Sequence, residues 1–368
     1  MGNKSGKPGQ TAPYLDSILS EEEFASLSKF HRKSQRRSSS VGTSSHVKDN
    51  LKYVISIVSS YLKMIIHLKD NALVHWKKLE FPNSQTAHKR YAQFLCQGLQ
   101  SSKNVEADFE KWYSECPQFQ KLQTIYVYKL FCVPPPPVTY KHQMIEKHLV
   151  PSLFQSEGLQ KGTSFSILDM TDVLFLNSVL PKESQFEWSL CFSSVLHGQG
   201  FGKLVRCVTN KGPTLVIIKD KGGHVFGGYA SGSWTIGPNF HGDSESFLFR
   251  LYPDMQIFET TGYNNHYQYL NQQQQTMPNG LGMGGQFEYF GFWLDAEYGK
   301  GHCSESCSTY RNYKMLSSNK VFEEGGKSIL DKDSGAQALL EIAVWLSELH
   351  SIKQCTPWYW CTVDIPYV

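Results

Sequence analysis

The stretch of sequence that decides the fold spans residues 214–230 and reads Thr214-Leu-Val-Ile-Ile-Lys-Asp-Lys-Gly-Gly-His-Val-Phe-Gly-Gly-Tyr-Ala. Two apolar runs are separated by Lys221-Gly-Gly, and consecutive glycines supply the positive φ that tight hairpin turns require. The run 215–218 is continuously apolar, as expected of a strand that is buried on both faces. We therefore predict an antiparallel hairpin at the centre of a sheet, with positive φ at Gly223.

Further short β-branched and aromatic runs, separated by Gly, Pro and Asn, surround this hairpin and favour an antiparallel sandwich or barrel. The other predicted strands cover residues 186–192, 204–209, 247–252, 255–260 and 287–294. Apolar residues at steps of three and four predict one helix over residues 165–176 and another over residues 336–350. The predicted class is α+β, an antiparallel β-sandwich flanked by helices.

The rest of the chain divides by composition. Amphipathic periodicity predicts a helical region, and the proline run 134–137 marks a semi-rigid break because proline donates no backbone hydrogen bond. The predicted organisation is a mobile basic N-terminal arm over 1–50, a helical region over 51–133, a Pro-rich linker over 134–162, the sandwich domain over 163–345 and a divergent C-terminal tail over 346–368.

Charge and cysteine usage exclude several classes of protein. The 36 basic and 33 acidic residues leave a net charge of only +3, so nucleic acid is not an expected partner of the chain as a whole. Nine scattered cysteines with no secretory signal before them predict reduced thiols in the cytoplasm. The most apolar stretches are shorter than a spanning helix needs, so we expect no segment that crosses a membrane.

Three short motifs imitate ligand sites. Gly280-Leu-Gly-Met-Gly-Gly has the letters of a dinucleotide fingerprint, but it precedes an aromatic strand instead of opening a helix, which favours a tight loop. His302, Cys303 and Cys307 lack the second ligand pair of a structural zinc site and are interpreted as free thiols in a loop. The acidic run 331–335 misplaces the glycine of a calcium loop. We assign no metal and no cofactor.

Possible acid and base groups do not form a known catalytic pattern. His197, His224 and His241, with Asp243 and Glu245, could exchange protons. The sequence has no Gly-x-Ser-x-Gly elbow and no signature of an activated cysteine. Positions in loops and at strand edges are the simpler interpretation, and we expect no catalysis.

The N-terminus suits lipid attachment. Met1-Gly2-Asn-Lys-Ser-Gly exposes Gly2 after removal of methionine, which fits N-myristoylation, although position 6 is Gly where Ser or Thr is usual. One acyl chain gives marginal membrane affinity, and nearby basic residues add about 1 kcal/mol each at an anionic surface. The basic residues predicted to do so are Lys29, Arg32, Lys33, Arg36 and Arg37. The alternative is an ordinary basic tail or a nuclear-type signal.

Six blocks of sequence, in order, resemble the TLDc domain family. They are Trp188-Ser-Leu-Cys-Phe-Ser-Ser-Val-Leu-His-Gly, Gly212-Pro-Thr-Leu-Val-Ile-Ile-Lys-Asp, Gly223-His-Val-Phe-Gly-Gly-Tyr-Ala-Ser, Gly242-Asp-Ser-Glu-Ser-Phe-Leu-Phe, Thr261-Gly-Tyr-Asn, and the segment from Pro278-Asn-Gly-Leu-Gly-Met-Gly-Gly to Phe290-Gly-Phe-Trp-Leu-Asp. Leu196-His-Gly and Tyr263-Asn-Asn-His-Tyr-Gln-Tyr-Leu-Asn resemble the myristoylated, lysosomal, mTOR-associated (EAK-seven-like) branch. The resemblance covers about residues 163–318.

The resemblance implies a function that composition does not. It implies a non-catalytic adaptor tethered to the cytoplasmic face of the lysosomal membrane and present in the cytoplasm, which binds the vacuolar-type proton ATPase and mTOR signalling components. TLDc proteins are also associated with oxidation resistance, so an enzyme or regulator of oxidative-stress protection is the alternative. Gly2, the basic arm and the lack of assembled catalytic groups favour the adaptor.

Two departures from the family pattern carry expectations of their own. The EF-hand-like N-terminal region of the family is mostly absent. Between residues 321–324 and 327–331 the sequence also lacks the expected closing strand with its Glu-Val-Trp, and from about Ala343 it differs from the family. We therefore expect a sandwich without this strand, and a helix over 336–350 whose apolar stripe packs on the domain or in a groove of the proton ATPase.

Overall fold

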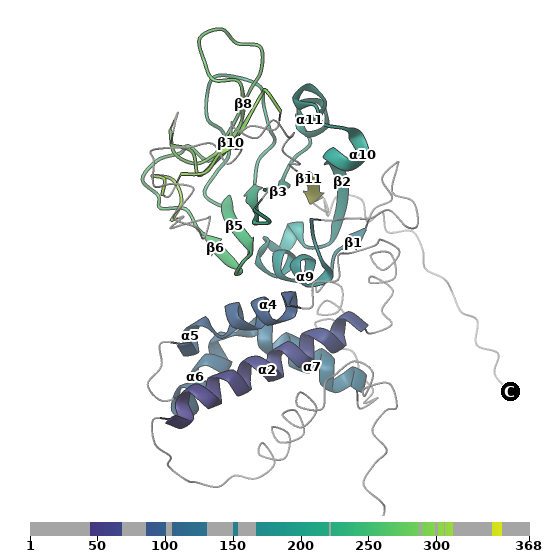
Figure 1. Cartoon of the computed structure of the whole chain (residues 1–368), viewed down its shortest axis with the longest axis vertical. Coiled ribbons are helices and arrows are strands. Elements are labelled where there is room, and N and C mark those ends of the chain that lie inside the picture. The colour runs from purple at the N-terminus through teal and green to yellow at the C-terminus, as the bar shows by residue number, and fades with distance from the viewer. Residues whose placement is uncertain are drawn as a thin grey trace, which may run out of the picture.

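The computed structural model describes residues 45–67, 86–100, 105–130, 150–153, 167–220, 222–286, 289–298, 301–304, 306–311 and 341–347. A group of helices lies on one side and two β-sheets on the other, with helix α9 (Met170–Val179) between them (Figure 1). The predicted α+β class, an antiparallel sandwich with flanking helices, is confirmed.

The two sheets pack face to face. The larger has seven strands in the order β1-β2-β11-β3-β4-β5-β6, and the smaller has four in the order β10-β9-β8-β7. The strands are β1 Ser152–Leu153, β2 Glu187–Ser193, β3 Thr214–Lys219, β4 Val225–Ala230, β5 Phe247–Tyr252, β6 Gln256–Phe258, β7 Gln268–Asn271, β8 Gly280–Met283, β9 Phe292–Asp295, β10 Gly301–His302 and β11 Glu341–Ser347. All neighbours are antiparallel except β1 and β2. One buried cluster joins both sheets through residues such as Val216, Phe226, Leu281 and Phe292.

The predicted central hairpin is present. β3 and β4 pair from Thr214 opposite Ala230 to Lys219 opposite Val225. Gly223 has φ +83° in the connecting turn, as the sequence predicted. The apolar run of β3 from Leu215 to Ile218 is buried throughout, because the strand has neighbours on both sides and packing on both faces.

The helix predicted over residues 336–350 is wrong at residues 341–347, the part of this segment that the structure describes. Residues Glu341–Ser347 form strand β11, which lies between β2 and β3 and pairs antiparallel with both. Residues 321–331, where the sequence lacks the expected closing strand, lie outside the described residues, and β11 occupies the place between β2 and β3 in the sheet. Ala343 and Val344 are buried at the sheet centre. A central strand is apolar on both faces, and its apolar residues then also satisfy the three- and four-residue steps of a helix.

Two other segments differ from their predictions. Residues 204–209 were expected to be a strand, but helix α11 spans Phe201–Val208 and buries Phe201, Leu204, Val205 and Val208, which are helically spaced once Phe201 is included. The glycine motif expected to be a tight loop instead forms strand β8, followed by a turn. A Cβ at Gly280 or Gly282 would overlap the Trp293 ring of β9, so this strand accepts only glycine at these places.

The helical unit comprises α2 (Ser45–His67), α4 (Ala87–Leu95), α5 (Gln97–Gln100), α6 (Val105–Glu115) and α7 (Pro117–Leu130). Helix α2 begins at Ser45, earlier than the expected boundary at residue 51. None of the helices within the described ranges combines the length and the apolar character needed to span a membrane.

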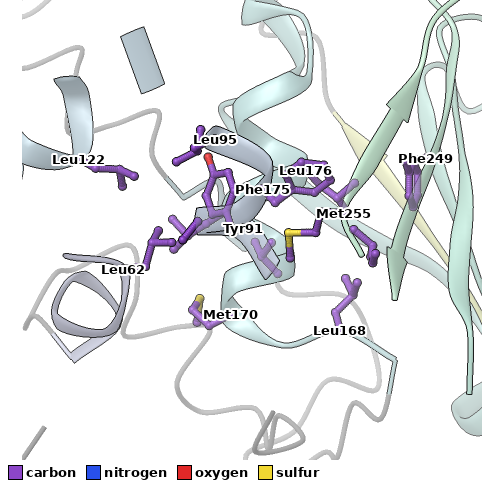
Figure 2. Packing of buried hydrophobic residues seen from close by; sticks show 14 of the residues in the cluster. Leu62, Tyr91, Leu95, Leu122, Leu168, Met170, Phe175, Leu176, Phe249 and Met255 are labelled. Carbon is purple, nitrogen blue, oxygen red and sulfur yellow. The ribbon is translucent and has the colours of Figure 1, made fainter. Parts of the chain in front are cut away.

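The helical unit and the sandwich share one buried core. Leu62 of α2 and Tyr91 of α4 belong to the same cluster as Phe175 of α9 and Phe249 of β5 (Figure 2). The Tyr91 and Phe175 rings meet edge to face, with centroids 5.5 Å apart. Helix α9 therefore acts as the layer through which the helices pack on the larger sheet.

Candidate functional site

The site residues predicted in the N-terminal arm lie outside the described residues. These are Gly2, Lys29, Arg32, Lys33, Arg36 and Arg37. The acidic run 331–335 also lies outside them. The lipidation site and its basic cluster therefore stay predictions from sequence.

The structure does not assemble the predicted acid and base groups into one site. Nδ1 of His224 lies 2.9 Å from Oδ2 of Asp220, within the turn of the central hairpin. Nδ1 of His197 accepts a hydrogen bond from the backbone N–H of Ser193 at 2.9 Å. His241 pairs through its backbone with strand β7. The side chains of His197 and His224 thus each have a separate local partner.

One acidic candidate, Asp243, stabilises a turn, in which Glu245 takes part through its backbone N–H. Oδ1 of Asp243 accepts hydrogen bonds from the Ser231 hydroxyl at 2.7 Å and from the Glu245 backbone N–H at 2.9 Å. These contacts fix the loop that leads into β5. They account for the geometry of Asp243 without a catalytic role.

The motifs that imitate ligand sites are part of the sandwich. Cys303 is buried beside β10, and Cys303 and Cys307 are free thiols. Burial, followed by the negative charge of Asp220, raises the pKa of the Cys303 thiol well above its usual value. Within the described ranges no group of three or more His, Cys, Asp or Glu side chains is placed to hold a metal ion.

A cavity of about 500 Å³ lies where three loops of the sandwich meet. Its lining residues come from the loop before β5, the loop before β7 and the turn after β8. They are Pro238, Asn239, Phe240, Asn265, His266 and Gln286. No prediction from the sequence pointed to this cavity, although residues 263–266 are part of the block that resembles the family.

His266 and Phe240 form a stacked wall of the cavity. Their ring centroids are 4.3 Å apart and their planes differ by 14°. Nδ1 of His266 lies 2.7 Å from the carbonyl oxygen of Gly285. Because a carbonyl oxygen only accepts, Nδ1 carries a proton and donates it in this contact. Phe240 also contacts Tyr269 and Phe290 of a small buried aromatic cluster, which holds the wall rigid.

A buried hydroxyl joins two of the loops. Thr309 is fully buried, and its Oγ1 accepts from the backbone N–H of Gly285 at 2.8 Å and donates to Oδ1 of Asn264 at 2.7 Å. Asn264 in turn accepts from the backbone N–H of His266 at 3.1 Å. The loop carrying His266 and the turn carrying Gly285 are thus fixed relative to one another.

Two exposed tyrosines lie close in sequence to the lining residues. Tyr263 is 86% exposed and precedes the lining residue Asn265 by two positions. Tyr289 is 65% exposed, and its backbone N–H donates to the carbonyl of the lining residue Gln286 at 2.9 Å. Exposed aromatics on rigid loops are typical of binding surfaces. A concentration of Gly, Tyr, Asn and His over 262–266 is the sequence signal that could have indicated this surface.

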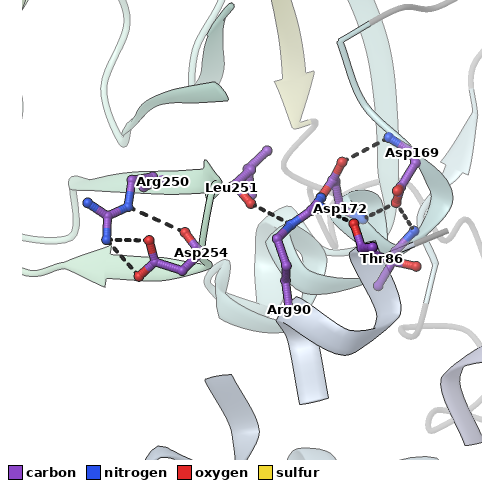
Figure 3. A network of polar contacts seen from close by, with 8 residues as sticks. Thr86, Arg90, Asp169, Asp172, Arg250, Leu251 and Asp254 are labelled. Atoms are coloured by element: carbon purple, nitrogen blue, oxygen red, sulfur yellow. Dashed lines mark hydrogen bonds and ion pairs between the residues drawn. The ribbon is translucent and has the colours of Figure 1, made fainter. Parts of the chain in front are cut away.

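A buried cation joins the helical unit to the sandwich (Figure 3). Nε of Arg90 donates to the carbonyl oxygen of Leu251 at 3.0 Å, and Nη2 lies 3.4 Å from Oδ1 of Asp172. The Arg90 and Asp172 side chains are 9% and 6% exposed. The guanidinium also lies 5.4 Å from the centre of the Tyr252 ring. Arg90 therefore links α4 to α9 and to the end of β5.

The acidic partner of Arg90 belongs to a helix cap. Oδ1 of Asp169 accepts from the backbone N–H groups of Thr171 and Asp172, while Oδ2 of Asp172 accepts from the backbone N–H of Asp169. This reciprocal pattern is a capping box at the start of α9. Burial, and then the charge of Asp169, raises the pKa of Asp172 well above its usual value, and Arg90 opposes that rise. The cluster is structural.

Comparison with known proteins places the sandwich in a family context. Residues 162–324 match the TLDc domain family. The MTOR-associated protein MEAK7 of Gallus gallus is 48% identical over 202 residues, which cover 50% of this chain and 43% of that protein. The protein of the same name from Homo sapiens is 45% identical over 213 residues, which cover 52% of this chain and 46% of that protein. Oxidation resistance protein 1 of Rattus norvegicus is 31% identical over 143 residues, 39% of this chain and 16% of that protein. The chain spans about half the length of the MEAK7 relatives that it matches.

Proposed function

We propose that this chain is a non-catalytic adaptor in mTOR signalling, because it belongs to the TLDc domain family and is similar to its MEAK7 members. In this proposal the chain is tethered to the cytoplasmic face of the lysosomal membrane, where it binds the vacuolar-type proton ATPase. The identity to two proteins named for their association with mTOR carries this proposal.

The N-terminal sequence supports the membrane part of the proposal. Gly2 stands where a myristoyl transferase would modify it, and Lys29 and Arg32 begin a run of basic residues behind it. A single acyl chain needs such a second signal for stable attachment, and both occur on the same arm.

The arrangement of the polar groups supports an adaptor over an enzyme. The side chains of His197 and His224 have separate local partners, and the cavity residues that the structure describes include no carboxylate and no thiol. The MEAK7 relatives are also named for an association and not for a reaction. Similarity to Oxidation resistance protein 1 supports a second candidate, a role in protection against oxidative stress.

Membrane fractionation of the Gly2→Ala variant tests the tether. The variant should move to the soluble fraction, because loss of the acyl chain removes the apolar contribution to binding. Neutralising Arg32, Lys33, Arg36 and Arg37 should weaken attachment and reduce its dependence on salt. Lys52→Ala, a substitution at an exposed position of α2, is the control for the loss of one positive charge outside the basic cluster. Unchanged fractionation of Gly2→Ala would exclude the lipid tether.

Affinity capture from lysosomal membranes tests the partners. The wild-type chain should retain proton ATPase subunits and mTOR components, and Gly2→Ala should retain fewer because it no longer concentrates on the membrane. Absence of both partners in the wild-type capture would refute the adaptor. Turnover of peroxide by the pure protein would instead favour the oxidative-stress candidate.

A further inference from the structure

We propose that the outer surface of helices α10 (Ser194–His197) and α11 is a second membrane contact, which binds anionic lipid headgroups. This inference rests on the proposed membrane location of the chain, but it requires neither the lipid on Gly2 nor the basic arm. Exposed apolar side chains on α10 and exposed cations on and after α11 carry it. Both helices lie on the outside of the sandwich, away from the helical unit (Figure 1).

The apolar part of this surface is a single helical turn. Val195 and Leu196 are 61% and 37% exposed, and within the described residues they are the only two large exposed apolar side chains that are adjacent in sequence. Oγ of Ser193 accepts a hydrogen bond from the backbone N–H of Leu196 at 3.5 Å. The His197 ring stacks on Phe192 of β2, with centroids 5.8 Å apart, and its Nδ1 accepts from the backbone N–H of Ser193. Because the turn is fixed in this way, insertion of its apolar side chains among lipids costs little conformational entropy.

The cationic part of the surface is the solvent side of α11. The apolar residues of this helix are buried in the core of the sandwich, whereas Lys203 and Arg206 are exposed. These two residues are three positions apart and therefore lie on the same side of the helix. Lys211, just after the helix, is also exposed. Between Glu187 and Asp220 the sequence contains no acidic residue.

The apolar turn and the cations belong to one region of the surface. Only residues 198–200 separate the two helices, so the end of α10 and the start of α11 are at most about 15 Å apart. Both helices also contact strand β2. Exposed Glu297 lies near α10, because the hydroxyl of the next residue, Tyr298, lies beside Ser194. The three cations outnumber this acid, so the region attracts anions.

The apolar turn favours a membrane over a soluble acidic peptide. Each basic residue near an anionic membrane strengthens attachment by about fivefold, and an acidic peptide would offer the same kind of attraction. Val195 and Leu196 project from the turn and do not line the cavity between the loops, so a deformable bilayer can bury them. The proposed lipid on Gly2 would in addition hold this surface close to the headgroups and raise their effective concentration.

Sedimentation of the full-length chain with lipid vesicles tests the proposal. The reference protein carries Gly2→Ala and Gln at each of the five basic positions predicted for the arm, so that the arm supplies neither lipid nor positive charge. It should sediment with vesicles of phosphatidylcholine and about 30% phosphatidylserine, and not with phosphatidylcholine alone. Adding Lys203→Gln, Arg206→Gln and Lys211→Gln should weaken binding at least about tenfold and make it less dependent on salt. Failure of the N-terminal tether would appear separately, as unchanged fractionation of Gly2→Ala.

A matched triple variant removes the same charge elsewhere. Lys89→Gln, Lys111→Gln and Lys182→Gln lie at exposed positions outside α10 and α11, and together they should leave binding close to that of the reference protein. Melting temperatures close to that of the reference protein would show that each variant is folded.

The apolar turn has its own test. Val195→Ser with Leu196→Ser should weaken binding about threefold or more while its dependence on salt is retained. Absence of sedimentation of the reference protein, equal losses in the two triple variants, or unchanged binding of this double variant would each overturn the proposal. Tighter binding of a soluble octaglutamate peptide than of the vesicles would also overturn it, because the cations would then serve an acidic protein partner.

Discussion

At the scale of single residues, Arg90 is a buried cation that joins three segments. Its guanidinium bonds to the carbonyl of Leu251 and lies beside the carboxylate of Asp172. Replacement Arg90→Met would leave Asp172 buried without its cation, and breaking a buried pair in this way costs about 3–5 kcal/mol. We expect urea denaturation to show a loss of unfolding free energy of that size. A loss below about 1 kcal/mol would mean that the pair contributes little.

The pH dependence of this variant follows from Asp172. Burial and the charge of Asp169 already raise the pKa of Asp172, and Arg90 is the group that opposes the rise. Without Arg90 the folded state therefore binds a proton that the unfolded chain has released, so stability falls as pH rises through the interval between the two pKa values. The difference in unfolding free energy between wild type and Arg90→Met should be smaller at pH 5 than at pH 8. Asp172→Asn in the Arg90→Met background should abolish this pH dependence.

Substitution of two glycines, Gly223 and Gly285, measures the cost of a left-handed backbone separately from the cost of steric overlap. Gly223 and Gly285 have φ values of +83° and +78°, but no atom lies within 4 Å of a Cβ placed on Gly223, whereas a Cβ on Gly285 would overlap the carbonyl of Tyr289. Gly223→Ala should lower the unfolding free energy by about 1–2 kcal/mol from the left-handed backbone alone. Gly285→Ala should lose about 1–3 kcal/mol more through overpacking. Equal losses, measured by thermal or urea unfolding, would contradict the reading of the turn that carries Gly285.

At the scale of elements, the sequence predicted those strands whose burial can be recognised from a local pattern of apolar residues and turn glycines. Leu215–Ile218 is apolar without interruption and lies at the sheet centre, and Gly222 and Gly223 mark its turn. Strand β8 could not be predicted, because its glycines are required by the Trp293 ring on a neighbouring strand and local propensity counts them against a strand. The same holds for β11, whose strand state comes from β2 and β3, both distant in sequence.

The cavity shows the same limit. Its lining residues come from three loops that are brought together by long-range contacts such as the Thr309 bridge. Periodicity and spacing describe neighbours along the chain and contain no such pairing. Residues 263–266 can be recognised in the sequence as a polar and aromatic run, but nothing in the sequence connects this run with Phe240 and Gln286.

The central position of β11 gives an element-scale prediction. Ala343 pairs with Ser193 of β2 and with Ile217 of β3, so Ala343→Pro removes a ladder donor in the middle of the larger sheet. We expect a loss of about 3 kcal/mol or more, or insoluble protein, because β2 and β3 would then present unpaired edges. Truncation after Ser347 retains β11 and is the matched control. A Pro variant as stable as this control would show that β11 is dispensable.

At the scale of the whole molecule, the helical unit and the sandwich share a core and a buried cation. The aromatic contacts of Tyr91 with Phe175 and the Arg90 cluster both cross the boundary between them. A boundary with this much buried contact is expected to couple the unfolding of its two sides. The helical unit is then part of the scaffold of the larger sheet, on which it packs through α9.

Two buried thiols, one on each side of that boundary, test the coupling. Cys96 follows α4 and is fully buried, and burial raises its pKa to about 12, so at pH 8 only about one thiol in ten thousand is a thiolate. Cys303 is buried in the sandwich, and its pKa is also raised. If the molecule unfolds as one unit, iodoacetamide labelling at pH 8, followed by peptide mass spectrometry, should modify both thiols over the same range of urea. In Arg90→Met the boundary is weakened, and Cys96 should then be labelled at lower urea than Cys303. Labelling of Cys96 well before Cys303 in the wild type would show that the helical unit opens by itself, and identical curves in Arg90→Met would show that the shared apolar core, and not the buried cation, couples the two sides.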